Sequence, residues 1–228
     1  PISVDAPAGK NMPKRIINIA SIMNGWSMGG VIQSSDPDVL KAIKRSNISI
    51  SAYQDLIDFG NKQKTNRTYT EIILGLPSDT KERHFESLRL GVEKSVNNLR
   101  MHQAMLLTGT EMASKRDREK YGLVTKFRTL PGNVGNYNIL NEEHPVAEIE
   151  EIVVGSNTLS MNDYVECRIM NLIIKTFYNN NIFNEIHSMQ RAMGISPFDC
   201  LVYIKDHEEM YTKKVKKIIE SFVTETTE

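Results

Sequence analysis

The chain has 228 residues, and its 28 lysines and arginines balance its 28 aspartates and glutamates. With 40% hydrophobic and 25% charged residues, it has the composition of an ordinary globular protein, which excludes a disordered or fibrous chain. The balanced charge offers no basic excess for nucleic acid, and no apolar run approaches the ~20 residues of a membrane helix. We therefore expect neither a nucleic-acid partner nor a membrane partner.

The first strand-then-helix pattern lies near the N-terminus. Residues 1–12 are rich in proline, glycine and alanine without any periodicity, and we expect an irregular lead-in there. A helical pattern follows and stops at residues 24–25, Asn-Gly, and an extended stretch covers residues 26–33. The next helix has a clear start, because Asp36 can cap it and Pro37 suits the first helical position.

Two further units of the same kind follow. After a helix over residues 51–59, residues 69–76 form a short apolar run bounded by glycine and proline, which is typical of a buried parallel strand. A helix begins near residue 80, and residues 99–107 are again strand-like. A charged helix then ends at residues 121–122, Tyr-Gly.

Strands that alternate with helices of this size predict a parallel sheet with right-handed crossovers. We expect strands within residues 28–34, 69–76 and 99–107 to be neighbours in chain order. Three strands cannot close a barrel and leave unpaired edges. The predicted fold is therefore α/β, half of a TIM-like barrel over residues 1–125, and we expect the missing strands to precede Pro1.

Residues 126–228 are predicted to form a mainly helical region. The segment 123–144 contains turn signals and is expected to be irregular. Ser160 and Asp163 resemble a capping box, and the helix after them is apolar on several sides, so it should be buried. A last amphipathic helix is expected over residues 207–222, with its lysines on the solvated face.

The sequence predicts no metal site within the chain. Its five histidines have no two-histidine spacing, and Cys167 and Cys200 lie too far apart to indicate a disulfide framework or a paired-ligand motif. We expect both thiols to be reduced in a cytoplasmic protein. The two glycines of residues 132–135 lack the strand and helix that flank a phosphate-binding loop, so they predict a turn.

Candidate binding residues follow from position, because ligands of parallel sheets bind where the strands end. Gln33 and Ser34 offer hydrogen-bonding groups at the first end, and Gly75 at the second lets a ligand approach the backbone closely. The third end is at residues 107–109. The structural alternative is that residues 34–36 only cap a helix and that Gly75 only turns the chain.

Three segments, in order, resemble the later strands of the radical S-adenosylmethionine (radical SAM) superfamily. Residues 31–36 and the helix after them are similar to the fourth strand and helix of that family. Residues 70–77, Thr-Glu-Ile-Ile-Leu-Gly-Leu-Pro, resemble the fifth strand. Residues 106–110, Leu-Leu-Thr-Gly-Thr, resemble the end of the sixth, with threonine where proline is common. The likeness covers residues 26–125, and the helical remainder is more loosely similar to the tails of cobalamin-binding radical SAM proteins.

The resemblance implies S-adenosylmethionine (SAM) as a ligand. Gln33 and Ser34 would face its ribose or methionine end, and the backbone around Ile73 and Gly75 would pack near its adenine. In that family a four-iron, four-sulfur cluster, held by a C-x3-C-x2-C loop, cleaves SAM reductively, and the resulting radical abstracts hydrogen from a substrate. This chain has no such loop, so the cluster ligands are absent from it. The use of cobalamin and the substrate both stay open.

Two functions remain open from the sequence. The first is a fragment of a radical SAM enzyme, inactive alone, whose partner is the missing N-terminal half of the barrel. The alternative is a non-catalytic α/β binding or interaction module derived from such an enzyme. If the front half is missing, we expect Val31 and Ile32 to be covered by residues 1–25, by another chain, or not at all.

Overall fold

The structure is a computed structural model, and it describes residues 4–7, 12–23, 25–62 and 68–228. Its centre is a parallel sheet with the strand order β1-β2-β3-β4. The strands are β1 (Val4–Pro7), β2 (Trp26–Gly29), β3 (Thr68–Leu74) and β4 (Asn98–Gln103). The prediction that three strands lie parallel and adjacent in chain order is therefore confirmed.

β1 corrects the prediction for the N-terminus. Residues 1–12 were expected to be irregular, but Val4–Pro7 pair in parallel with Trp26–Gly29. A four-residue strand at the edge of a sheet depends on backbone hydrogen bonds to its neighbour, and no side-chain periodicity is needed for it. The sheet thus extends one strand further toward the N-terminus than the apolar runs indicate.

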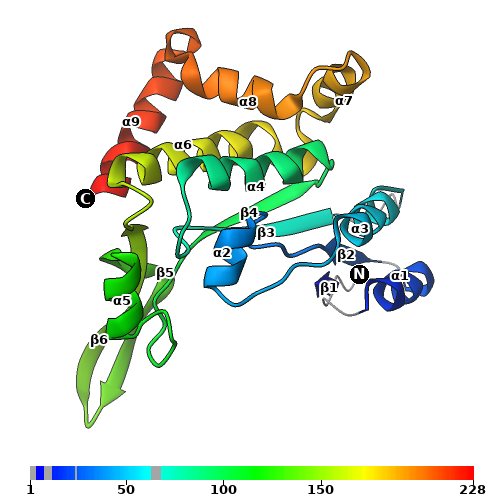
Figure 1. The fold of residues 1–228 in the computed structure, drawn as a ribbon. Coiled ribbons are helices and arrows are strands. Elements are labelled where there is room, and N and C mark those ends of the chain that lie inside the picture. The colour runs from blue at the N-terminus through cyan, green and yellow to red at the C-terminus, as the bar shows by residue number, and fades with distance from the viewer. Residues whose placement is uncertain (1–3, 8–11, 24, 63–67) are drawn as a thin grey trace.

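Helices cover one face of this sheet in two layers (Figure 1). The inner layer contains α4 and α6, which contact each other and β4, and α8 packs outside them. Ile72, Leu88 and Met170 are fully buried where the sheet meets α4 and α6. The helices of this part are α3 (Ile50–Lys62), α4 (Lys81–Glu93), α6 (Met161–Phe177) and α8 (Pro197–Asp206).

Local capping signals place several helix starts where the sequence predicts them. Asp36 accepts hydrogen bonds from the backbone N–H groups of Asp38 and Val39 at the start of α2 (Pro37–Ala42). Ser160 accepts from the N–H of Asp163 at the start of α6. The remaining helical elements are α1 (Pro13–Ile22), α5 (Lys115–Tyr121), η1 (Asn179–Asn181), α7 (Asn184–Ala192), η2 (Glu208–Met210) and α9 (Lys213–Thr227).

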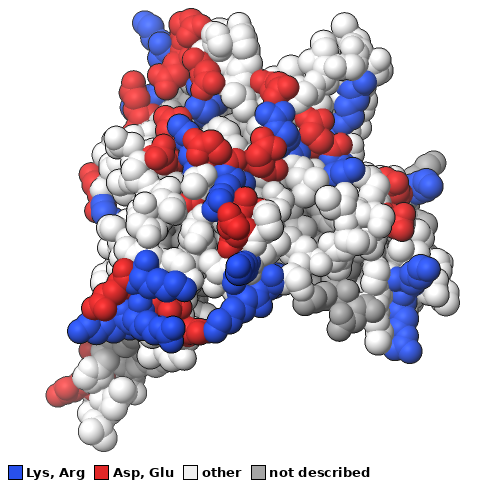
Figure 2. Space-filling model, in the orientation of Figure 1, with Lys and Arg blue, Asp and Glu red and all other residues white. Residues whose placement is uncertain are grey.

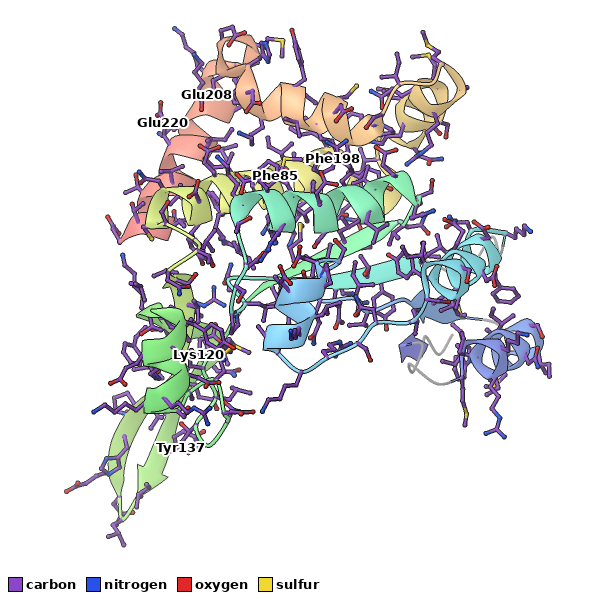
Figure 3. The ribbon with its side chains drawn as sticks, in the orientation of Figure 1. Phe85, Lys120, Tyr137, Phe198, Glu208 and Glu220 are labelled. Atoms are coloured by element: carbon purple, nitrogen blue, oxygen red, sulfur yellow. The ribbon has the colours of Figure 1, made fainter. Side chains whose placement is uncertain are left out.

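The outer helices pack through aromatic contacts. Phe85 of α4 and Phe198 of α8 meet edge to face, with ring centroids 6.4 Å apart, and Figure 3 shows the two rings between these helices. The final helix begins at Lys213, later than the predicted residue 207, because Thr212 caps it and η2 precedes it. Within the described residues, no helix has both the length and the apolar character needed to cross a bilayer.

A long β-hairpin corrects the prediction that residues 123–144 are irregular. β5 (Val124–Ile139) and β6 (Glu142–Gly155) pair antiparallel and project from the body of the molecule, as Figure 1 shows. A register shift between Thr129 and Val134 accommodates the Pro-Gly pair, and Leu140 and Asn141 turn the chain at positive φ. The distal hairpin is exposed, so no burial pattern marks it in the sequence. The division of the chain at residues 125/126 stays a prediction.

The expected cover of Ile32 is also wrong. Ile32 is 3% exposed, and it packs in one cluster with Tyr53 and Ile57 of α3 and with Ile72 of β3. The cover is thus the helical layer of the same sheet, and neither residues 1–25 nor a second chain is needed. Val31 is half-buried.

Candidate functional site at the carboxyl edge of the sheet

Gln33 extends the sheet beyond the end of β2. Its backbone N–H donates to the carbonyl of Glu71, and its own carbonyl accepts from the N–H of Ile73, both at 2.8 Å. The residue adopts a φ of 56°, in the left-handed region that few side chains occupy. These bonds tie Gln33 to Ile73 at the edge where parallel sheets bind ligands.

Ser34, in contrast, is turned into the protein. It is 2% exposed, its hydroxyl oxygen accepts from the N–H of Asp36 at 3.2 Å, and it lies 3.5 Å from the hydroxyl of Ser87 in α4. The side-chain amide of Asn47 donates to the Ser34 carbonyl at 2.7 Å. Ser34 therefore holds the start of α2 against α4, and it lines neither of the pockets at this edge.

Gly75 turns the chain after β3 at a φ of 84°. A side-chain carbon at this position would lie 3.2 Å from the carbonyl oxygen of Val153. At Gly75 it is therefore strand β6, and not a ligand, that approaches the glycine backbone closely. Gly75 also donates its N–H to the carboxylate of Asp79, at 3.4 Å.

β6 crosses the carboxyl edge, a feature that the sequence reading missed. The segment after β4 pairs antiparallel with it: Leu106 donates its N–H to Glu151, and Val153 donates to Ala104, at 2.9 and 2.8 Å. Val153 is fully buried in a cluster with Leu76 and Leu106. The apolar run Ile-Val-Val over residues 152–154, followed by glycine, was the available signal for this strand.

Two pockets open at this edge, on either side of Leu76 and Met112, which line both. The pocket beside Gln33 has a volume of about 430 Å³, and the pocket beside Ile73 has about 360 Å³. Both volumes are in the range of small-molecule sites. Gln33 and Ile73 therefore lie in adjoining pockets, whereas Ser34 and Gly75 line neither of them.

Charged side chains surround the larger pocket. Lys44, Arg45 and Asp117 line it, and the ammonium group of Lys44 lies 2.5 Å from the carboxylate of Glu111. Figure 2 shows Lys and Arg side chains gathered over α5, the helix that contributes Asp117. A ligand at this edge would meet both signs of charge together with the amide of Gln33.

The face of the sheet opposite α4 and α6 carries polar side chains. Ile72 and Leu74 of β3 are fully buried toward the helices, so the alternate residues Glu71 and Ile73 point the other way. Arg100 of β4 lies 3.7 Å from Glu71 and stacks 3.8 Å over the ring of Tyr69. This face therefore has an ion pair where a core would be apolar.

Asp79 is a buried carboxyl group at this edge. It is 1% exposed, and its carboxylate accepts from the N–H groups of Gly75 and Thr80. Burial raises the pKa of Asp79 to about 7, although these two bonds act in the opposite direction. A carboxyl group that titrates near neutral pH is suited to proton transfer, and it is also found in purely structural sites.

The described residues do not suit a four-iron, four-sulfur cluster. They contain no group of three or more His, Cys, Asp or Glu side chains placed to hold a metal ion. Cys167 is fully buried, and burial raises the pKa of its thiol well above the usual range, while Cys200 lies apart on α8. Such clusters need several thiolates, so no step of a reaction is assigned to a cluster held by this chain.

Two curated proteins are similar in sequence. The chain is 29% identical over 175 residues to the cobalamin-dependent radical SAM methyltransferase TokK of Streptomyces tokunonensis, covering 73% of this chain and 24% of that protein. It is 28% identical over 170 residues to the 2-(S-pantetheinyl)-carbapenam-3-carboxylate methyltransferase of Streptantibioticus cattleyicolor, covering 69% of this chain and 23% of that protein. The chain thus spans about a quarter of the length of these relatives.

Among solved structures, the coproporphyrinogen III oxidase HemN of Escherichia coli, described as a radical SAM enzyme, matches with a TM-score of 0.40 and 18% identity. That match covers 46% of this chain and 24% of that one. No protein-family model matches the sequence.

Proposed function

Because this chain is related to the radical SAM superfamily, we propose that it forms part of a larger enzyme that carries out SAM-dependent radical chemistry or methylation. In this proposal its parallel sheet is the back half of a TIM-like partial barrel. The observation that carries the proposal is the pair of adjoining pockets at the carboxyl edge, where Gln33 and Ile73 are joined by a backbone hydrogen bond. Ligands of α/β sheets bind at this edge.

SAM is the proposed ligand of this edge. When bound, it supplies the adenosyl and methyl groups on which the chemistry of such enzymes depends. The amide of Gln33 offers a donor and an acceptor for its polar end, and the half-buried side chain of Ile73 offers an apolar surface for its adenine. Ser34 and Gly75 support the site indirectly, because Ser34 fixes α2 against α4 and Gly75 lets β6 approach the edge.

The iron–sulfur cluster of the complete protein would be held outside this chain, since the thiolates are absent here. Cobalamin is proposed as a further cofactor, because the name of one relative includes it. The proposed setting is reducing and cytoplasmic, which suits the free thiols of Cys167 and Cys200.

Calorimetric titration of SAM into the purified chain tests the proposal. We expect weak but saturable binding, because only one side of the ligand is contacted. Ile73→Trp should fill the smaller pocket and weaken the binding at least about tenfold, which corresponds to about 1.4 kcal/mol. Ile139→Trp is the matched control: Ile139 is 55% exposed on the distal hairpin, so its variant should bind SAM like the unaltered chain.

The rival function is a non-catalytic binding module that has kept the fold and lost the ligand. The absence of cluster thiolates in the chain is compatible with this rival as well as with the proposal. A chain that unfolds cooperatively but shows no saturable binding of SAM would support the rival and contradict the proposal. Equal binding by the Ile73→Trp variant would place SAM elsewhere.

A further inference from the structure

Arg168 differs from the other half-buried arginines of the described chain. Arg83, Arg89 and Arg118 each donate to a carboxylate, at 2.6–2.7 Å for the shortest contact. Arg191 has no carboxylate partner but donates to the carbonyl of Val92 at 3.0 Å. Arg168 has no hydrogen-bond or ion-pair partner among the described residues, and its guanidinium lies 5.1 Å over the ring of Phe222. A partly desolvated cation without a counter-charge is costly unless a bound anion compensates it.

The unpaired guanidinium lines a small pocket of about 190 Å³ between the base of the hairpin, α6 and α9. Tyr164 lines the same pocket one helical turn before Arg168, so the two side chains are on one face of α6. Tyr164 is 1% exposed, and its hydroxyl has no hydrogen-bond partner among the described residues. The hydroxyl oxygen keeps some access to solvent through the pocket, so water or a ligand can reach it.

Charges of both signs line the pocket beside Arg168: the cations Lys126 and Arg128, and the exposed carboxylates of Glu225 and Glu228. Arg128 of β5 also lines the pocket, and burial together with Arg128 lowers the pKa of Arg168. Arg128 itself contacts Glu150 and the side-chain oxygen of Gln103. Glu225 is on the rim, where it is exposed and accepts from Ser221, so it pairs with neither arginine.

We propose that Arg168 and Tyr164, with Arg128 beside them, form a binding site for the oxyanion of a small molecule, a phosphate or a carboxylate. The guanidinium provides a planar fork of donors that matches both groups, and the phenol provides one more donor. The pocket is large enough for the anionic end of a ligand, and Gln103 and Arg128 separate it from the pocket beside Ile73. The site does not depend on the proposed function, because its binding is testable without SAM.

Titration of inorganic phosphate into the 228-residue chain, at constant ionic strength set with chloride, tests the site directly. A parallel titration with succinate distinguishes a phosphate from a carboxylate site. We expect saturable binding of at least one of the two. Arg168→Gln should weaken it about tenfold or more, and Tyr164→Phe should weaken it about threefold, as expected for the loss of a charged and a neutral hydrogen bond. Arg116→Gln, on the exposed surface of α5, is the control for a lost charge and should bind normally.

Thermal unfolding without any ligand separates this site from a structural role. If Arg168 and Tyr164 serve a ligand, Arg168→Gln and Tyr164→Phe should leave the unfolding temperature nearly unchanged, because neither side chain makes a hydrogen bond to the described residues. Phosphate or succinate should then raise that temperature for the unaltered chain and for Arg116→Gln only. A lower unfolding temperature for both pocket variants, or no saturable binding of either anion by the unaltered chain, would overturn the proposal.

Discussion

Asp79 and His84 are both buried, and burial moves their pKa values in opposite directions. Asp79 titrates at about 7 instead of 3.8, so between these values the folded chain binds more protons than the unfolded chain. Its contribution to the free energy of unfolding therefore falls as the pH rises from about 4 to 7, by roughly 4 kcal/mol in total. Asp79→Asn should remove this fall, so the stability of the variant relative to the unaltered chain should increase with pH. Urea unfolding at several pH values measures it.

His84 is the matched counterpart, because burial lowers its pKa from 6.5 to about 4 while Asn171 bonds its Nε2 at 3.1 Å. Its contribution is complete above pH 6.5 and is lost as the pH falls toward 4, by roughly 3 kcal/mol. His84→Gln should therefore show the opposite trend relative to the unaltered chain. Parallel pH profiles for the unaltered chain and both variants would mean that neither group is shifted as described.

A comparison of Gly75→Ala with Gly109→Ala measures how closely β6 packs against the carboxyl edge. Both adopt a φ of 84°, but only Gly75 has a neighbour, Val153, where a side chain would begin. Gly109→Ala should cost about 1 kcal/mol from backbone strain alone. Gly75→Ala should cost at least about 1 kcal/mol more, because Val153 must move. Equal losses in denaturant unfolding would show that β6 does not press on the edge.

At the scale of elements, the two ends of β6 have different roles. Val153 is fully buried under the carboxyl edge, whereas Val146 is 46% exposed on the distal arm, where Tyr137 also projects (Figure 3). Val153→Ala should lower the free energy of unfolding by about 2 kcal/mol, and Val146→Ala by less than about 0.5 kcal/mol. Similar small losses of unfolding free energy for both variants, measured in guanidinium, would mean that Val153 adds no core packing between β6 and the sheet.

The inner strands and most of the helices could be predicted because each has a local signal, whereas α7 and α8 were not located individually. The run Ile-Ile-Leu of β3 is buried on its helical side, and Asp36 and Pro37 determine where α2 starts. The distal hairpin has no such signal, since its side chains are exposed and its pairing is made by the backbone. β1 likewise pairs through its backbone and has no apolar run in the sequence.

The candidate site could be predicted only in part. The rule that ligands bind at strand ends identifies Gln33, and the family resemblance adds Ile73; both residues line the pockets. It cannot tell that Ser34 turns toward Ser87 or that Val153 occupies the space beside Gly75. Both contacts join residues more than 50 positions apart in the chain, so they depend on packing that no local pattern encodes.

At the scale of the whole molecule, the chain places two kinds of surface around one parallel sheet. One face is closed by α4, α6 and α8, and the opposite face carries Glu71 and Arg100. A sheet with an ion pair on one face is suited to a polar interior or to a ligand rather than to a dry core. This arrangement agrees with the proposal that the chain is one part of a larger enzyme, of whose relatives it spans about a quarter.

Hydrogen–deuterium exchange with and without millimolar SAM tests the central claim most directly, because it locates the ligand on the chain. The proposal predicts slower exchange at the carboxyl edge, in the segments around Gln33, residues 73–76 and residues 104–107, with no change in the distal hairpin or α9. Protection confined to the helical layer, or unchanged exchange at all three segments under conditions where SAM binds, would contradict it.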